Sequence, residues 1–409
     1  MKPLFTLIDK GLTYSTNAAT VEPPLYICNK HTWMKSLRSL ALLPAMLFLY
    51  GSLLAQPAGL KTGFHSGEYE DLLFLNSMFY KDSLENGKTV GKEQVYRFVY
   101  RSPEMGLKNR WDLWLREDRT AVISIRGTVQ HASSWMENFY AAMVPAQGDI
   151  KINATETFRY KLAADPKATV HAGWTVGLAH LAPDMTEKIR GLMEENKISA
   201  LIITGHSQGG ALAFLATSYF YYLSESGGLP GKIPIKAYCS AAPKPGNLYY
   251  AYDFDYITRN GMAFNVINGA DWVPETPPSV QTFSDINPTN PFNNATTLLG
   301  KQKWPANWYL NSVYKKLKRT PNKTLHRYEK YFGHKIYGQV RKTLPGLQEP
   351  VYAGTSNYMR AGSPVVLMPD EAYYQKFPDT TSKVFLHHGY EPYLYLLHKI
   401  YGQRPEKFD

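Results

Sequence analysis

The chain has 409 residues, of which 44% are hydrophobic, so it is long enough for one large domain or two smaller ones with a sizeable core. Its formal net charge is +11, but a nucleic-acid site needs clustered Lys and Arg, and the densest cluster, residues 315–319, is short. A solvated face explains the charge better, with attraction to an anionic membrane or polymer surface as the alternative. No nucleic-acid partner is therefore predicted.

The N-terminal region carries the pattern of a secretory signal peptide. A short basic stretch at residues 34–38 precedes an almost wholly apolar run at residues 40–54, and we expect cleavage after Ala55. The alternative is an uncleaved membrane anchor, but the run is about the minimum length for spanning and contains Pro44 and Gly51. The protein is predicted to be secreted or periplasmic, with no stable membrane span after cleavage.

A signal peptide normally starts at the initiator methionine, which makes Met34 the expected true start. Residues 1–33 are then a mis-assigned extension, residues 34–55 the signal peptide and residues 56–409 the mature protein. Cleavage leaves Cys239 as the single cysteine, so the mature chain can form no internal disulfide. We expect Cys239 to be a small core residue.

The first elements of the mature chain are predicted from hydrophobic periodicity. Apolar residues at helical spacing indicate a helix at residues 69–80. Residues 96–100 and 111–116 are rich in β-formers and flank a turn, which predicts a hairpin. A third strand at residues 120–125 runs directly into Arg-Gly-Thr at residues 126–128.

Residues 205–209, Gly-His-Ser-Gln-Gly, stand between an apolar β-branched run at residues 201–203 and a segment with helical spacing. This is the pattern of a nucleophile elbow, in which a sharp strand-to-helix turn exposes a serine hydroxyl. Gly205 and Gly209 are expected there because the turn leaves no room for a Cβ. Ser207 is the candidate nucleophile, and helix N-terminal amides would favour the negative charge of acyl transfer. An ordinary turn is the alternative.

Three later segments add candidate partners for a serine nucleophile. Strands are predicted at residues 233–239 and 264–268, and the second leads into Asp-Trp-Val-Pro-Glu-Thr-Pro-Pro at residues 271–278. Triad chemistry needs an acid at such a strand end. Near the C-terminus, residues 388–394 read His-Gly-Tyr-Glu-Pro-Tyr-Leu, and the order Ser, Asp, His is that of α/β-hydrolases.

These segments, together with residues 170–174, resemble the class 3 lipase family of fungal triacylglycerol lipases and their bacterial and plant relatives. The resemblance implies an α/β-hydrolase fold, with a mainly parallel central sheet flanked by helices and an inserted cap or subdomain. It also implies carboxylic ester hydrolysis without a metal or an organic cofactor. In the family the lid follows the Arg-Gly-Thr loop, which corresponds here to residues 129–169.

The resemblance also implies residue roles. Asp271 corresponds to the triad acid, and Thr128 to the oxyanion-hole residue that acts beside the amide of Gln208. His206 is the elbow residue between Gly205 and Ser207. His171 corresponds to a histidine that packs near the site rather than acting as the base.

The catalytic base is expected after Asp271. The histidines in that part of the chain are His326, His334, His387, His388 and His398. The family's closing pattern has a histidine, an acidic residue three places on and an aromatic residue five places on. That spacing selects His388, with the adjacent His387 as the alternative.

About a hundred residues, 280–383, separate the predicted acid from the predicted base, which is far more than the family usually needs. We expect a helix at residues 308–319 within this insertion. Loops on the catalytic face commonly set specificity, so the insertion is predicted to shape the acyl or alcohol pocket. A surface insertion without a role in the site is the alternative.

The function predicted from these observations is that of a secreted serine hydrolase cleaving carboxylic esters. The expected substrate is a lipid ester, an acylglycerol, met at a lipid–water interface. One alternative is an esterase acting on polysaccharide-linked or other small esters, because the 30 tyrosines would suit sugar stacking. The other is a non-catalytic binding or envelope protein on the same scaffold.

Overall fold

The computed structural model describes residues 60–80, 84–292, 299 and 304–402. The predicted extension and signal peptide, residues 1–55, lie outside the described residues, so both stay predictions. The chain divides into two compact units, Met1–Gln56 and Pro57–Asp409, and the fold below is that of the second.

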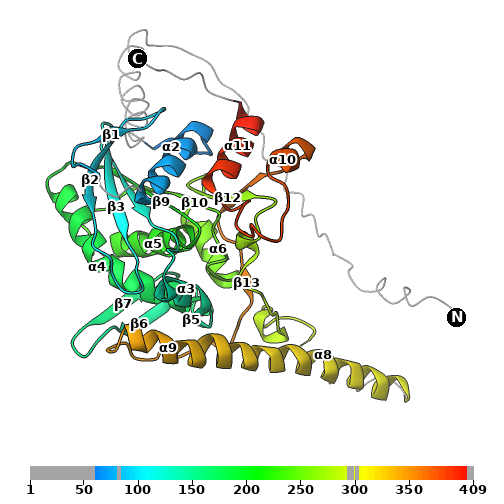
Figure 1. Ribbon diagram of the computed structural model, residues 1–409. Helices are drawn as coiled ribbons and strands as arrows, with labels where there is room; N and C mark the ends of the chain where they lie inside the picture. Colours follow the sequence, from blue (N-terminus) through cyan, green and yellow to red (C-terminus); the bar gives the residue numbers. More distant parts are fainter. Residues whose placement is uncertain (1–59, 81–83, 293–298, 300–303, 403–409) are drawn as a thin grey trace, which may run out of the picture. The chain divides into compact units, whose positions relative to one another are not determined.

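An eight-stranded sheet organises this unit (Figure 1). In spatial order its strands are β1 (Thr89–Val90), β2 (Tyr96–Arg101), β3 (Trp111–Arg116), β4 (Thr120–Ile125), β9 (Ala200–His206), β10 (Ile235–Ser240), β12 (Ala263–Asn268) and β14 (Ser363–Leu367). Strands β1 to β4 pair antiparallel, and every pairing from β4 to β14 is parallel. The predicted hairpin and the predicted central strands are confirmed.

Helices cover both faces of the sheet. One face carries α2 (Ser66–Ser77), α10 (Glu371–Lys376) and α11 (Tyr390–Tyr401), and the other carries α4 (Ala172–Glu194), α5 (Gln208–Glu225) and α6 (Leu248–Ile257). Strands β3, β4, β9 and β12 are buried along their whole length, as expected for strands covered on both sides. The predicted α/β-hydrolase fold, with its mainly parallel sheet, is confirmed.

Two smaller sheets and several short elements lie at the end of the main sheet where β9 ends. A four-stranded sheet has the order β13 (Tyr358–Met359), β11 (Gly246–Asn247), β8 (Thr169–His171) and β5 (Met143–Pro145). A separate ribbon pairs β6 (Gln147–Lys151) with β7 (Thr157–Lys161). The remaining short elements are α3 (Ala132–Phe139) and the 3₁₀ turns η1 (Met78–Tyr80), η2 (Val273–Glu275) and η3 (Phe283–Asp285).

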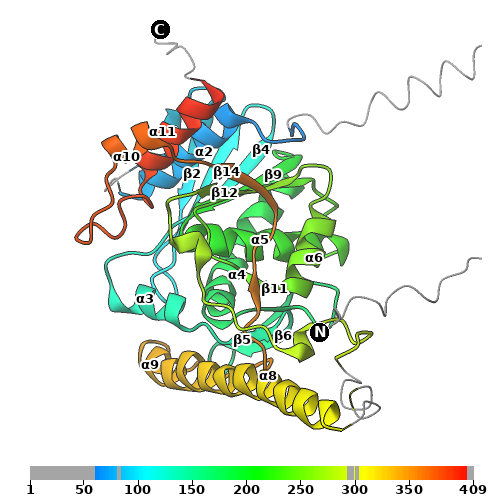
Figure 2. The ribbon, with the colours of Figure 1, turned by 90° about the vertical axis from the view of Figure 1, so that its right-hand side faces the viewer.

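The predicted insertion, residues 280–383, contains a long exposed helix and also a strand of the eight-stranded sheet. Its helical part is α8 (Ala306–Tyr328), the π-helical η4 (Glu329–Lys335) and α9 (Ile336–Thr343), which follow one another along the outside of the unit (Figure 2). The strand β14 completes the main sheet beside β12, so the segment outside the sheet is shorter than predicted. Pro364 is tolerated in β14 because this is the edge strand.

The helix expected at residues 308–319 is longer than predicted and continues to Tyr328 through Pro321. Proline ordinarily disfavours a helix interior because it lacks an N–H donor. Here the carbonyl deprived of that donor belongs to Leu317, which is exposed, so water can satisfy it. Within the described residues, no helix is both long and apolar enough to cross a membrane.

Candidate active site

Ser207 lies at the turn between β9 and α5, where the sequence predicts the elbow. Its backbone has φ 63° and ψ −129°, a left-handed conformation that is unusual for a residue with a side chain. A Cβ on Gly205 would come within 2.2 Å of the Gly209 backbone, and a Cβ on Gly209 within 2.1 Å of the Ile125 oxygen. The two glycines therefore make the sharp turn possible.

His388 and Asp271 are joined by a short hydrogen bond, although 117 residues separate them. The His388 Nδ1 atom lies 2.7 Å from Asp271 Oδ2. The same oxygen accepts from the Tyr393 hydroxyl at 2.8 Å, and Asp271 Oδ1 accepts from the Val273 amide at 3.0 Å. Because a carboxylate accepts, Nδ1 carries the proton, and Nε2 of His388 is left with a free lone pair.

The backbone of His388 is held by His206. His206 Nε2 donates to the His388 carbonyl at 2.8 Å, and its Nδ1 accepts from the Ser240 hydroxyl at 3.0 Å. The Ser240 oxygen in turn accepts from Tyr69 at 2.6 Å. Burial, followed by the proximity of His388, lowers the pKa of His206 to about 3. The His206 ring therefore stays neutral and holds the backbone of His388 through its hydrogen bond.

His387 is directed away from this pair. Its ring contacts the Tyr373 hydroxyl at 2.7 Å through Nδ1 and Asp379 Oδ1 at 2.9 Å through Nε2. Its carbonyl accepts from Asn268 at 2.9 Å. The two adjacent histidines thus have different partners, and only His388 contacts Asp271.

The loop after β4 brings Thr128 to the side of the elbow. The Thr128 hydroxyl donates to Gln208 Oε1 at 2.8 Å and accepts from Asn138 Nδ2 at 2.9 Å. Because Trp174 Nε1 donates to Asn138 Oδ1 at 3.0 Å, the orientation of the Asn138 amide is determined. Gln208 is the first residue of α5, so its backbone N–H has no partner within the helix.

A buried glutamate, Glu137, is connected to Gln208 through Asn109. Glu137 is fully buried on α3 and accepts from Asn109 Nδ2 at 2.6 Å, while Asn109 Oδ1 accepts from Gln208 Nε2 at 3.4 Å. Burial raises the pKa of Glu137 to about 8, so below that pH the side chain is a neutral acid. Sequence analysis missed Glu137 and Asn109, because nothing in their local pattern distinguishes them from surface residues.

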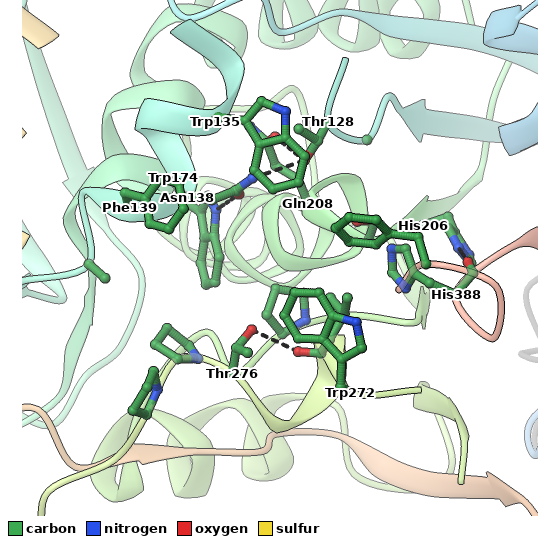
Figure 3. Close-up of a pocket in the computed structure, with 18 of the residues that line it drawn as sticks. Thr128, Trp135, Asn138, Phe139, Trp174, His206, Gln208, Trp272, Thr276 and His388 are labelled. Atoms are coloured by element: carbon green, nitrogen blue, oxygen red, sulfur yellow. Dashed lines mark hydrogen bonds between the residues drawn. The ribbon is translucent and has the colours of Figure 1, made fainter. Parts of the chain in front are cut away.

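One pocket of about 560 Å³ joins these groups. Thr128, Ser207, Gln208 and His388 all line it. Figure 3 shows Trp135, Phe139, Trp174 and Trp272 around the same space, with the Thr128–Gln208 and Trp174–Asn138 contacts on one side. Further apolar walls come from Tyr328, Phe332 and Phe385. Within the described chain, no hydrogen bond joins Ser207 Oγ to the His388 ring, although both face this pocket.

The other histidines are held elsewhere. His334 contacts Glu349 at 2.8 Å, His398 contacts Glu70 at 3.1 Å, and His326 is exposed. His171 caps α4, stacks on Trp174 with ring centroids 3.6 Å apart and contacts the Asn138 carbonyl at 3.1 Å, which is the packing role expected for it. Cys239 is buried in β10, as predicted.

Residues 122–281 match the protein family described as lipase (class 3). The match runs from β4 through the elbow and past Asp271. This part of the chain is similar to the class 3 lipase family. The family resemblance predicted from the sequence is confirmed. The lid expected at residues 129–169 stays a prediction, and α3 within that range lines the pocket through Trp135 and Phe139.

Curated relatives of this chain include two fungal enzymes. A secreted mono- and diacylglycerol lipase of Fusarium solani is 26% identical over 168 residues, which are 41% of this chain and 42% of the relative. A secreted mono- and diacylglycerol lipase of Malassezia globosa is 25% identical over 173 residues, which are 42% and 51% of the two chains. The chain thus spans about half the length of these curated relatives.

Solved structures similar to this chain include a triacylglycerol lipase from Penicillium expansum. The likeness has a TM-score of 0.39 and 16% sequence identity, and it covers 53% of this chain and 75% of that one. A lipase from Yarrowia lipolytica has the same TM-score and identity, with 54% and 77% covered.

Proposed function

We propose that this protein is a secreted serine hydrolase of the class 3 lipase type that cleaves acylglycerol esters through Ser207, His388 and Asp271. The observation that carries the proposal is the 2.7 Å hydrogen bond between His388 and Asp271 at the pocket that Ser207 also lines. It leaves a basic Nε2 on the imidazole beside a serine on a strained elbow, which is the arrangement that nucleophilic acyl transfer needs. Secretion is supported by the predicted signal peptide.

In the proposed reaction, Ser207 Oγ bonds to the ester carbonyl carbon while its proton moves to His388 Nε2. The resulting oxyanion accepts hydrogen bonds from the Thr128 and Gln208 amides, each worth roughly 3–4 kcal/mol. The carbon–oxygen bond to the alcohol then breaks, and the leaving alcohol takes the proton from His388. Water attacks the acyl-enzyme by the same route, which releases the carboxylic acid and restores Ser207. Asp271 stabilises the imidazolium in both halves.

The walls of the pocket support a lipid acyl chain as the substrate group. Four tryptophan and phenylalanine side chains from three segments, Trp135 and Phe139 of α3, Trp272 and Phe385, border the cavity. Trp272 contacts Phe385 at 5.3 Å between ring centroids, and Phe385 contacts Trp135 at 5.8 Å. A pocket of this composition gains from burying apolar surface and offers few partners for sugar hydroxyls.

The test is hydrolysis of p-nitrophenyl esters from short to long chains, and of mono-, di- and triacylglycerols, by the full chain and by Ser207→Ala. We expect activity that favours longer chains and disappears in the variant. Activity confined to short soluble esters would instead support the small-ester esterase. A folded protein with no Ser207-dependent hydrolysis of any of these esters would overturn the proposal.

The adjacent histidines provide a matched control. We expect His388→Gln to remove nearly all activity, because Nε2 is the proposed proton acceptor, whereas His387→Gln should keep most of it. Both variants lose one imidazole at neighbouring positions, so a general effect of the substitution would lower both rates equally. Loss in His387→Gln with retention in His388→Gln would overturn the assignment of the base.

A further inference from the structure

The helical segment from Trp304 to Thr343 is here called the basic arm, and its first helix, α8, is mostly exposed. On α8, Tyr328 is the residue that is buried. At the other end, Tyr314 stacks on Phe283 with 5.5 Å between ring centroids and donates to the Phe292 carbonyl at 2.7 Å. The helix between these two anchors runs along the outside, and Figure 1 shows its N-terminal part projecting from the sheet.

The basic arm carries most of the net charge of the chain. It contains ten Lys or Arg residues and a single acidic residue, Glu329, whereas the whole chain has a net charge of +11. None of these ten basic side chains forms an ion pair with another described residue. Six of them lie on α8, namely Lys315, Lys316, Lys318, Arg319, Lys323 and Arg327. Their charge is therefore not balanced within the part of the chain that the structure describes.

The helix is also amphipathic. Leu310, Tyr314, Leu317, Leu325 and Tyr328 recur at helical spacing and form one stripe, with the basic residues mainly on the opposite side. The middle of this stripe is not covered by the protein, since the side chain of Leu317 is 58% exposed.

Large aromatic side chains lie at the N-terminal end of the arm. Trp304 is 83% exposed, Trp308 68% and Tyr309 63%. Exposed tryptophan and tyrosine beside lysine and arginine are typical of helices that lie in the interface of a lipid layer.

We propose that the basic arm is a docking element for an anionic lipid surface, which α8 contacts lying flat. The inference rests on the proposed function, because it names the kind of surface on which that site would meet its substrate. Charge complementarity identifies the partner, since anionic headgroups attract an unbalanced basic helix. The exposed Leu317 and the exposed aromatic side chains distinguish it from a nucleic-acid site, which would use the charge but not exposed apolar side chains.

The arm is connected to the pocket. Tyr328, at the C-terminal end of α8, and Phe332 in η4 both line the cavity that contains Ser207 and His388. Tyr328 also belongs to a small core with Ala141 and Tyr358. A lipid surface held along the arm is thereby held next to one wall of the pocket.

The test uses the full chain carrying Ser207→Ala, so that binding is measured without hydrolysis. Flotation with phosphatidylcholine vesicles should give weak binding, and vesicles with about a quarter phosphatidylserine should give strong binding that salt weakens. The arm variant replaces Lys315, Lys316, Lys318 and Arg319 by Gln. Since each basic residue at such a surface changes binding by roughly fivefold, we expect at least a tenfold loss.

A control variant replaces Lys88, Arg97, Lys151 and Lys161 by Gln. These four residues are exposed, and their replacement removes the same formal charge as the arm variant does. Binding that depends on net charge alone would therefore fall equally in both variants. Equal loss would overturn the proposal, as would tighter binding to duplex DNA than to anionic vesicles at the same salt. Thermal melting should be unchanged in both variants, because the substituted side chains are exposed.

The outcome is separable from that of the proposed function. Hydrolysis of a short soluble p-nitrophenyl ester by the arm variant with Ser207 intact should match that of the unaltered chain. If hydrolysis fails while vesicle binding persists, the proposed function fails alone. If hydrolysis persists while anionic vesicles bind no better than neutral ones, the docking proposal fails alone.

Discussion

Around Asp271 each carboxylate oxygen has a hydrogen-bond donor, whereas the basic side chains in the middle of α8 have no ion-pair partner within the described chain. The polar groups of the first region are enclosed by helices and strands, and those of the second face solvent. Enclosed polar groups have their geometry determined by their neighbours. Exposed charges act at a distance on whatever surface approaches. The polar groups around Asp271 thus have fixed positions, whereas the basic side chains of α8 face solvent with an unbalanced charge.

The largest expected effect comes from altering the enclosed region at Asp271→Asn. The amide would present a donor to His388 Nδ1 and favour the tautomer with the proton on Nε2, which cannot accept the Ser207 proton. We expect kcat on a soluble ester to fall roughly 10⁴-fold. Binding to anionic vesicles should not change. A fall of less than about tenfold would contradict the role proposed for Asp271.

The second effect concerns the buried Glu137, whose pKa is raised to about 8 by burial. Because the folded state holds its proton more tightly than the unfolded state, the stabilising contribution is complete below about pH 4.5 and is lost as pH rises through 8. Glu137→Gln removes this titration. Between pH 5 and 8, the free energy of unfolding of the unaltered chain should therefore fall about 3 kcal/mol further than that of the variant.

Urea unfolding at several pH values would measure this difference. Parallel pH profiles for the two proteins would show that Glu137 keeps an ordinary pKa. Glu104 is a useful comparison, because hydrogen bonds from Arg126 and Lys108 lower its pKa to about 2, and Glu104→Gln should leave the profile unchanged in this range.

The smallest effect is expected from the arm. Leu317→Ser removes an exposed apolar side chain, so the free energy of unfolding should change by no more than about 0.5 kcal/mol, and hydrolysis of a soluble ester should not change. Vesicle binding should weaken, because the stripe loses its central residue. A large loss of stability in thermal or urea unfolding would show that Leu317 is packed, and the contrast between the two regions would fail.

Much of the enclosed region could be predicted from the sequence, because its motifs are local. The elbow needs glycine where Gly205 and Gly209 stand, and the strand before Asp271 contains the β-formers Phe264, Val266 and Ile267. The position of His388 depended on a spacing that its neighbour His387 nearly shares, and the structure separates the two by their hydrogen-bond partners.

Other features depend on contacts that no local pattern reveals. Glu137 lies near polar residues in sequence, and its burial results from packing between α3 and α4, where even Gly177 leaves little room beside it. The extent of α8 was obscured by Pro321, and β14 by Pro364 at its start. In both cases proline is tolerated because water or an open edge replaces the missing partner.

The bond from His206 to the carbonyl of His388 spans 182 residues, and it has a consequence for the order of synthesis. During translation, Thr128, Ser207 and Gln208 are synthesised long before the segment that contains His388. With His388 as the proposed base, the emerging chain lacks this base until the later segment contacts β9 and Asp271. We therefore expect the nascent chain to hydrolyse no ester before the segment that contains His388 has been synthesised.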